Sequence, residues 1–166
     1  MNNKLFYICQ TLLEDNRLSS DRFQERIISP LNLLLSKVTT LNVCLHPRSQ
    51  KSNYYSLLLS KKIIFDNFIQ DYCGKNHIFI GHYSTIIFQL IAKSERVILI
   101  DLEWDQLPVD IYKSCSKVIK WYDFKNYLQN FELNSISCSN PNKEFLRIFE
   151  SSSSKKDEKT LKRLIS

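Results

Sequence analysis

Glycine is almost absent from this chain, which has only Gly74 and Gly81 among its 166 residues. Loops that cradle the phosphates of dinucleotides or ATP need closely spaced glycines, in the patterns G-x-G-x-x-G or G-x-x-x-x-G-K-[ST]. Neither pattern occurs here. The sequence therefore excludes the usual dinucleotide-binding and P-loop mechanisms.

Cysteine-based sites are also lacking. The five cysteines are odd in number, widely spaced and never arranged as C-x-x-C, so they indicate neither a zinc site nor a disulfide framework. We expect reduced, mostly buried thiols, and neither a metal nor another cofactor. The cysteines are Cys9, Cys44, Cys73, Cys115 and Cys138.

Long apolar runs are missing too. No run of the sequence approaches the ~18 apolar residues of a membrane-spanning helix, and the chain does not open with the basic and apolar segments of a signal peptide. We therefore expect a cytoplasmic protein.

The net charge of +6 is unevenly distributed. Residues 155–163 hold five basic and two acidic side chains, a net +3, so half of the excess lies in one tail. The remainder lacks the clustered basic stripe that is typical of nucleic-acid binders, and we expect no nucleic-acid partner. A basic tail fits peripheral contact with the anionic inner face of a membrane, but a frayed end explains it equally well.

The composition is that of one folded domain. Hydrophobic residues make up 43% of the chain and aromatic residues 12%, which is enough for one ordinary core, while the length is too short for two domains of usual size. We assign residues 1–150 to a single domain and residues 151–166, which are rich in serine and charge, to a polar tail.

Short apolar runs alternate with segments of helical periodicity along the whole chain. Ser20 or Asp21 is expected to cap the first helix, and Pro30 is expected to kink or divide it. The order predicts an α/β fold, a Rossmann-like open and mostly parallel sheet with helices on both faces. Predicted strands are residues 4–9, 41–45, 63–65, 77–81, 96–100 and 117–120; predicted helices lie at 20–35, 54–59, 67–72, 83–91, 109–112, 125–131 and 141–150.

The first candidate site is His46-Pro47-Arg48, which directly follows the strand at 41–45. Ligands of open α/β sheets bind at the carboxyl ends of the strands. There His46 is suited to donate a hydrogen bond to a phosphate or to protonate a leaving group near neutral pH, and Arg48 is suited to hold a phosphate as a fork. The alternative is a polar strand end, with a proline that stops the strand and a solvated arginine.

The second candidate site is Tyr83-Ser84-Thr85, after the strand at 77–81. The hydroxyls and the free N–H groups of a first helical turn favour phosphate binding, because the unpaired donors and the positive end of the helix dipole point the same way. The alternative is an ordinary helix cap, a position that favours Ser and Thr for structural reasons alone.

Together these two segments resemble a known enzyme family. LNVCLHPR and IFIGHYSTIIFQLIA resemble the HP and serine/threonine motifs of bacterial sialyltransferases, including the polysialyltransferases and the lipooligosaccharide sialyltransferases. LFYICQTLLED is similar to the first strand and loop of their nucleotide-binding domain. The resemblance covers roughly residues 4–103 and implies one half of a two-domain, GT-B-type glycosyltransferase: the C-terminal domain, which binds the donor.

The resemblance also implies roles for the matching residues. His46 and Pro47 of the HP motif, with Ser84 and Thr85, would hold the CMP part of CMP-sialic acid, with His46 supporting the departure of CMP and the two hydroxyls donating to the same phosphate. Such enzymes make capsule polysaccharide or lipooligosaccharide. Their general base lies in an acidic Asp/Glu-Asp/Glu-Gly motif, which this chain lacks. We therefore expect a domain that is inactive alone and is completed by an acceptor domain or chain.

Other polar residues have weaker assignments. Asp101 and Glu103, with Asp105 nearby, follow a predicted strand and are candidates for a base or metal ligand, or else a plain polar strand end. Gln10 is expected to line the cleft. His77 lies at the wrong end of its strand and is expected to be structural, and His82 fits either role.

Two further functions remain open on the sequence. One is a GT-B-type domain for another nucleotide sugar, because this fold hosts many donors. The other is a non-enzymatic Rossmann-like interaction module in which His46 and Ser84 are structural remnants.

Overall fold

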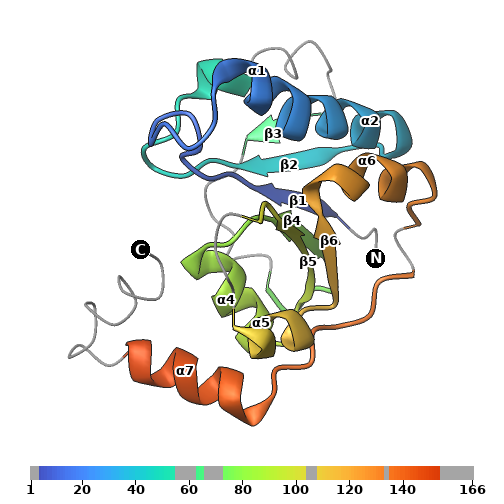
Figure 1. Ribbon diagram of the computed structural model, residues 1–166. Helices are drawn as coiled ribbons and strands as arrows, with labels where there is room; N and C mark the ends of the chain where they lie inside the picture. The colour runs from blue at the N-terminus through green and yellow to red at the C-terminus, as the bar shows by residue number, and fades with distance from the viewer. Residues whose placement is uncertain (1–3, 55–62, 66–72, 104–107, 133–134, 154–166) are drawn as a thin grey trace.

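A six-stranded, entirely parallel sheet forms the centre of the structure, which is a computed structural model that describes residues 4–54, 63–65, 73–103, 108–132 and 135–153 (Figure 1). The strand order is β3-β2-β1-β4-β5-β6, and every pair of neighbours is parallel. The predicted Rossmann-like α/β fold is thereby confirmed. The strands are β1 (Leu5–Ile8), β2 (Leu41–Cys44), β3 (Ile63–Phe65), β4 (Ile78–Gly81), β5 (Arg96–Asp101) and β6 (Lys117–Lys120).

The strand order reverses between β1 and β4. The chain builds outward from β1 through β2 to β3, then returns to pair β4 with the other edge of β1. The connections on the two sides of this point run away from each other, which leaves a crevice at the carboxyl ends of β1 and β4. Ligands of doubly wound folds bind in that crevice, so we expect a functional site there.

Helices cover both faces of the sheet (Figure 1). On one face α2 packs on α6; on the other, α7 packs on α4 and α5. The helical elements are α1 (Ser20–Phe23), the π-helical turn η1 (Gln24–Ile28), α2 (Ser29–Lys37), the 3-10 turn η2 (Lys51–Tyr54), α4 (Thr85–Ala92), α5 (Val109–Ser114), α6 (Trp121–Gln129) and α7 (Lys143–Ser153).

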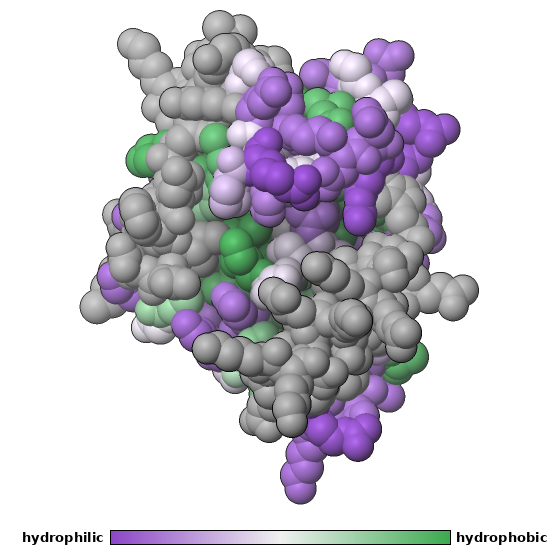
Figure 2. Space-filling view, turned by 90° about the vertical axis from the view of Figure 1, so that its left-hand side faces the viewer, coloured by the Kyte–Doolittle hydropathy of each residue, from purple (hydrophilic) through white to green (hydrophobic). Residues whose placement is uncertain are grey.

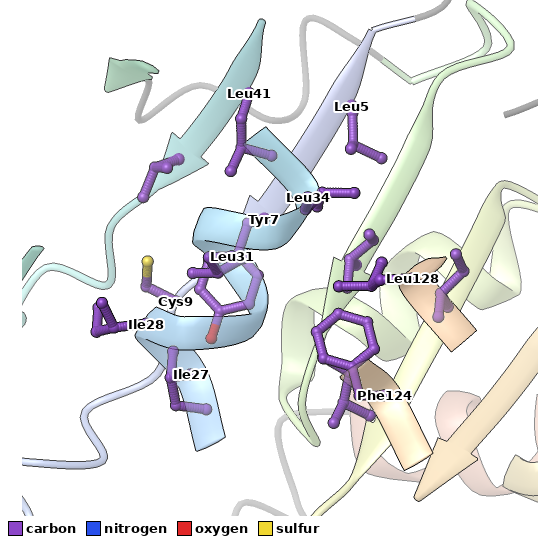
Figure 3. Packing of buried hydrophobic residues seen from close by; sticks show 14 of the residues in the cluster. Leu5, Tyr7, Cys9, Ile27, Ile28, Leu31, Leu34, Leu41, Phe124 and Leu128 are labelled. Carbon is purple, nitrogen blue, oxygen red and sulfur yellow. The ribbon is translucent and has the colours of Figure 1, made fainter. Parts of the chain in front are cut away.

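Each face of the sheet has its own hydrophobic core, and β1 contributes to both. Leu5 and Tyr7 belong to the cluster under α2 and α6 (Figure 3), whereas Phe6 and Ile8 belong to the cluster under α4, α5 and α7. Successive side chains of a strand point to opposite faces, so a continuous apolar run is what a strand covered on both faces requires. All four residues of β1 are buried.

The first predicted helix is divided near Pro30, as expected. The division is a π-helical turn, which the sequence did not predict. The helix changes from α1 to the wider π-helical turn η1 and resumes as α2, with Pro30 in its first turn. The wider turn accommodates the proline: the N–H of Ser29 donates to the carbonyl oxygen of Gln24, five residues earlier, where a regular α-helix would use the fourth. The predicted cap was one residue off: Ser19, not Ser20 or Asp21, is the N-cap, and its hydroxyl accepts from the N–H of Arg22 at 3.4 Å.

Three sequence predictions need correction or lie outside the described residues. Helix α7 runs to Ser153, three residues beyond the predicted end of this helix at residue 150. Tyr54 closes a 3-10 turn, and the rest of the predicted helix at 54–59, like the one at 67–72, lies outside the described residues. The thiols are not mostly buried: Cys9 and Cys44 are buried, Cys73 and Cys115 half-buried, and Cys138 exposed.

Candidate functional site

A pocket of about 270 Å³ opens at the carboxyl ends of β1 and β4, in the crevice where the strand order reverses. Figure 2 views the molecule from the side toward which β1 and β2 run in Figure 1, and a hydrophobic area in the middle of this view borders a strongly hydrophilic one. The pocket is lined by Ile8, Cys9, Gln10, Thr11, Leu12, Asp15, Arg17, His46, Pro47, Tyr83, Ser84, Thr85 and Ile86.

The structure brings the two sequence motifs together in this pocket. His46 and Pro47 enter from the turn after β2, and Ser84 and Thr85 enter from the start of α4. Gln10, which follows β1, lines the same pocket, as expected. Because β2 and β4 pair with opposite edges of β1, the two motifs face each other across the end of that strand.

The backbone of a tight turn fixes His46. The N–H of Ser49 donates to the carbonyl oxygen of His46 at 2.8 Å, and Pro47 pre-sets the backbone at the second position of this turn. The N–H of Arg48 donates to Nδ1 of the His46 ring at 3.2 Å. A neutral ring whose Nδ1 accepts carries its proton on Nε2, and no described residue bonds that Nε2. His46 therefore offers an N–H donor at the pocket.

Arg48 has a partner that the sequence did not reveal. Its Nη1 lies 2.9 Å from Oδ1 of Asp15 and its Nη2 lies 3.2 Å from Oδ2, so the pair is bidentate. Nη2 also lies 3.4 Å from Oγ1 of Thr11. Arg48 is not among the residues that line the pocket. The bonds from Thr11 and Arg48 lower the pKa of Asp15, so this carboxylate stays charged near neutral pH.

Ser84 is the N-cap of α4, which is the structural alternative that the sequence offered for the second motif. Its hydroxyl oxygen accepts from the N–H of Ile87 at 3.3 Å, which satisfies one of the unpaired donors of the first turn. The N–H groups of Thr85 and Ile86 have no intrahelical acceptor, because they precede the first helical hydrogen bond. Both residues line the pocket.

Gly81 allows α4 and β1 to approach each other closely. A Cβ at this position would lie 2.9 Å from Cδ1 of Ile87 and 3.0 Å from Cβ of Ile8. Real Cβ atoms essentially never come as close as the first distance, and the second is tighter than nine in ten real Cβ contacts. A glycine at the end of β4 therefore lets α4 pack tightly on β1, and this packing sets the distance between Ser84 and the end of β1.

His82 lies beneath the pocket and does not line it. Its Nε2 is 2.9 Å from the hydroxyl of Tyr7, and both side chains are buried. Burial lowers the pKa of His82 to about 4, although the carbonyl of Ile100 acts in the opposite direction. His82 is therefore a neutral, structural histidine, which settles the question left open by the sequence.

The carboxylate of Asp101 is held by structural partners. It accepts from Lys120 Nζ at 2.7 Å, from the N–H of Glu103 at 2.8 Å and from the hydroxyl of Tyr112 at 3.0 Å. Burial raises the pKa of Asp101, but these donors outweigh burial and leave it below its ordinary value. Glu103 also pairs with Lys120, at 3.3 Å. Neither acid lines the pocket, and Asp105 lies outside the described residues.

His77 lies at the amino end of β4, away from the pocket, as expected. It is buried, its Nδ1 accepts from the N–H of Lys4 at 3.2 Å, and its ring centroid is 5.5 Å from that of Phe6. These contacts join the starts of β1 and β4.

A second hollow of about 340 Å³ adjoins the first. The two share Ile8, Cys9, His46, Pro47 and Ile86, so the His46 turn stands between them. The lining of the second hollow also includes Cys44 and Leu45, from β2 and its end, and Ser49.

No protein-family model, no curated protein and no solved structure matches this chain. Within the described residues, no group of three or more His, Cys, Asp or Glu side chains is placed to hold a metal ion. The helices of the described ranges are all too short or too polar to cross a membrane.

Proposed function

We propose that this pocket binds the nucleotide part of an activated sugar. The observation that carries the proposal is the meeting of His46 and Pro47 with Ser84 and Thr85 in one pocket, at the point where strand order reverses. With the resemblance of these segments to sialyltransferase motifs, the proposed ligand is CMP-sialic acid. The chain is then the donor-binding domain of a glycosyltransferase for surface polysaccharide or lipooligosaccharide.

The proposed chemistry is stabilisation of a leaving phosphate. The start of α4 offers the N–H groups of Thr85 and Ile86 and the hydroxyl of Thr85 to phosphate oxygens. His46 Nε2–H donates to the same group from the opposite wall. When the bond between the sugar carbon and the phosphate oxygen breaks, negative charge grows on CMP, and preorganised donors stabilise it most strongly at that moment.

The deprotonation of an acceptor hydroxyl is assigned to another domain or chain. Asp15 is the carboxylate that the described residues place at the pocket, and its two oxygens already bind Arg48. Asp101, the other candidate, is buried and occupied by Lys120 and Tyr112. Neither carboxylate is free to act as the base, so the proposed domain needs a partner to transfer sugar.

The cellular location that we propose follows from the acceptors that sialyltransferases of this kind use. We propose that the domain works at the cytoplasmic face of a membrane, where glycolipid and capsule acceptors assemble, with the basic tail in contact with anionic lipid. The residues of that tail after Ser153 lie outside the described part of the chain.

Calorimetric titration with CMP, UMP, AMP and GMP tests the proposed ligand. We expect saturable binding of CMP, weaker binding of the other three nucleotides, and weakened but still measurable CMP binding in His46→Ala. Preference for UMP over CMP would instead favour a domain for another nucleotide sugar. A folded chain that binds none of the four nucleotides would contradict the proposal and favour an interaction module.

A further inference from the structure

The loop after β1 holds the turn after β2 through three side chains, Thr11, Asp15 and Arg48, which we call the loop clamp. Both carboxylate oxygens of Asp15 bind the Arg48 guanidinium, at 2.9 and 3.2 Å. Thr11 donates its hydroxyl to Asp15 and also lies 3.4 Å from Arg48. A bidentate pair fixes the direction of an arginine as well as its distance, so the clamp sets the position of Arg48 relative to β1.

A second contact holds the same turn from its other end. Oε1 of Glu14 accepts from the N–H of Gln50 at 2.8 Å and from Nδ2 of Asn53 at 2.9 Å. Glu14 and Asp15, which are neighbours in the loop after β1, thus bind the chain on both sides of Ser49. The turn that starts at His46 is therefore tied to the loop after β1 at two points.

Arg48 links this clamp to His46 through its backbone. While its side chain is held by Asp15, its N–H donates to Nδ1 of His46 at 3.2 Å. That bond keeps Nδ1 an acceptor, keeps the ring proton on Nε2, and limits rotation of the ring. A change at Asp15 is thereby transmitted to the histidine ring without any direct contact between the two side chains.

We propose that Asp15 is a positioning residue for His46: by fixing Arg48 it holds the Arg48 N–H on Nδ1 of His46 and keeps the Nε2–H of His46 presented to an anionic ligand. The identity of that ligand as a nucleotide phosphate rests on the proposed function. This role also explains why Arg48, which is 64% exposed, makes a bidentate pair instead of extending into water.

The competing explanation is an ordinary surface ion pair, which contributes little to a fold. An ordinary pair, when removed, changes stability slightly and leaves the His46 ring unaffected. Direct contact between Asp15 and the ligand is a further competitor, because Asp15 also lines the pocket. A positioning role, an ordinary ion pair and direct contact with the ligand predict different effects of an Asp15 substitution on the His46 ring and on ligand affinity.

The first experiment needs no ligand. In Asp15→Asn, hydrogen exchange of the Arg48 amide is expected to become about tenfold faster or more, and the ring nitrogen resonances of His46 are expected to shift. His77 and His82 serve as internal references in the same spectra, and Glu144→Gln is the matched control, because Glu144 pairs with Arg147 on α7. An unchanged Arg48 amide and an unchanged His46 ring in Asp15→Asn would overturn the proposal.

The second experiment is a double-mutant cycle with CMP. Asp15→Asn alone is expected to weaken CMP binding about tenfold, but to have no further effect in the His46→Ala background, because its effect passes through His46. Equal weakening in both backgrounds would overturn the proposal in favour of direct contact. If the unmodified chain binds no CMP, the proposed function fails, and the exchange experiment alone decides the role of Asp15.

Discussion

The hydroxyl of Tyr7, on β1, lies 2.9 Å from Nε2 of His82, which directly follows β4, and both side chains are buried. The two rings meet edge to face, with centroids 5.9 Å apart. The ring is accommodated as the neutral form, because a charged imidazolium would be buried without a counterion.

We predict that the stability of the fold falls as the pH drops from about 6.5 to about 4. The pKa of His82 is lowered by burial from 6.5 to about 4 in the folded state, so the unfolded chain binds the extra proton within this range and the folded chain does not. The contribution is complete above pH 6.5, declines toward pH 4, and amounts to about 3 kcal/mol. Chemical denaturation at a series of pH values measures it.

The matched comparison is His82→Gln against His77→Gln. Burial and the nearby ammonium groups of Lys4 and Lys75 also lower the pKa of His77, so both histidines act in the same direction. Removal of His82 is expected to abolish most of the pH dependence above pH 4. A slope that survives in His82→Gln but vanishes in His77→Gln would show that the assignment to His82 is wrong.

Gly81→Ala is predicted to destabilise the fold by about 1–3 kcal/mol through overpacking. The added Cβ meets Cδ1 of Ile87 and Cβ of Ile8; the first is the end of a side chain, and the second is fixed to the backbone of β1. Ile87→Val removes Cδ1, so the double variant should recover part of the loss in thermal unfolding. Strictly additive losses in the two variants would contradict this explanation.

Ser84→Ala and Thr85→Ala are predicted to differ in their effects on stability. Ser84 caps α4 through the N–H of Ile87, so its removal should cost about 1 kcal/mol. Thr85 is exposed and makes no capping bond, so its removal should change stability by less than about 0.5 kcal/mol. Both should weaken CMP binding. Equal effects on melting, or no effect of Thr85→Ala on CMP binding, would argue against these roles.

Asp101→Asn is predicted to destabilise the fold by about 2 kcal/mol without a change in nucleotide affinity. The carboxylate is 3% exposed and accepts from three groups, and a weaker acceptor leaves buried donors poorly satisfied. Lys120→Met, which removes one of these partners, should lower the melting temperature in the same direction. Loss of CMP binding in a still-folded Asp101→Asn would reassign this acid to the site.

Much of the fold could be predicted from the sequence because its signals are local. Each of the six predicted strands overlaps an observed one, since a short apolar run between polar segments is what a doubly covered strand requires. The meeting of the motifs at His46 and Ser84 also followed from a general rule, that parallel strands present their carboxyl ends on one edge.

The loop clamp could not be predicted from the sequence, and the reason is physical. Asp15 and Arg48 are 33 residues apart, and nothing in a one-dimensional pattern shows which loop side chains meet across a sheet edge. The same holds for Asp101 and Lys120, which are brought together only by the pairing of β5 with β6. Local signals identified the elements, whereas the partners of individual charges depended on tertiary packing.

Comparison of CMP with cytidine tests the central claim, that His46 and the start of α4 bind one phosphate. If they do, the chain should bind CMP at least about 30-fold more tightly than cytidine. His46→Ala and Thr85→Ala should each reduce this ratio, and the double variant should bring it close to one while cytidine affinity stays unchanged. Equal affinities for CMP and cytidine in the unmodified chain, or losses of the same size for both ligands in the variants, would contradict the claim.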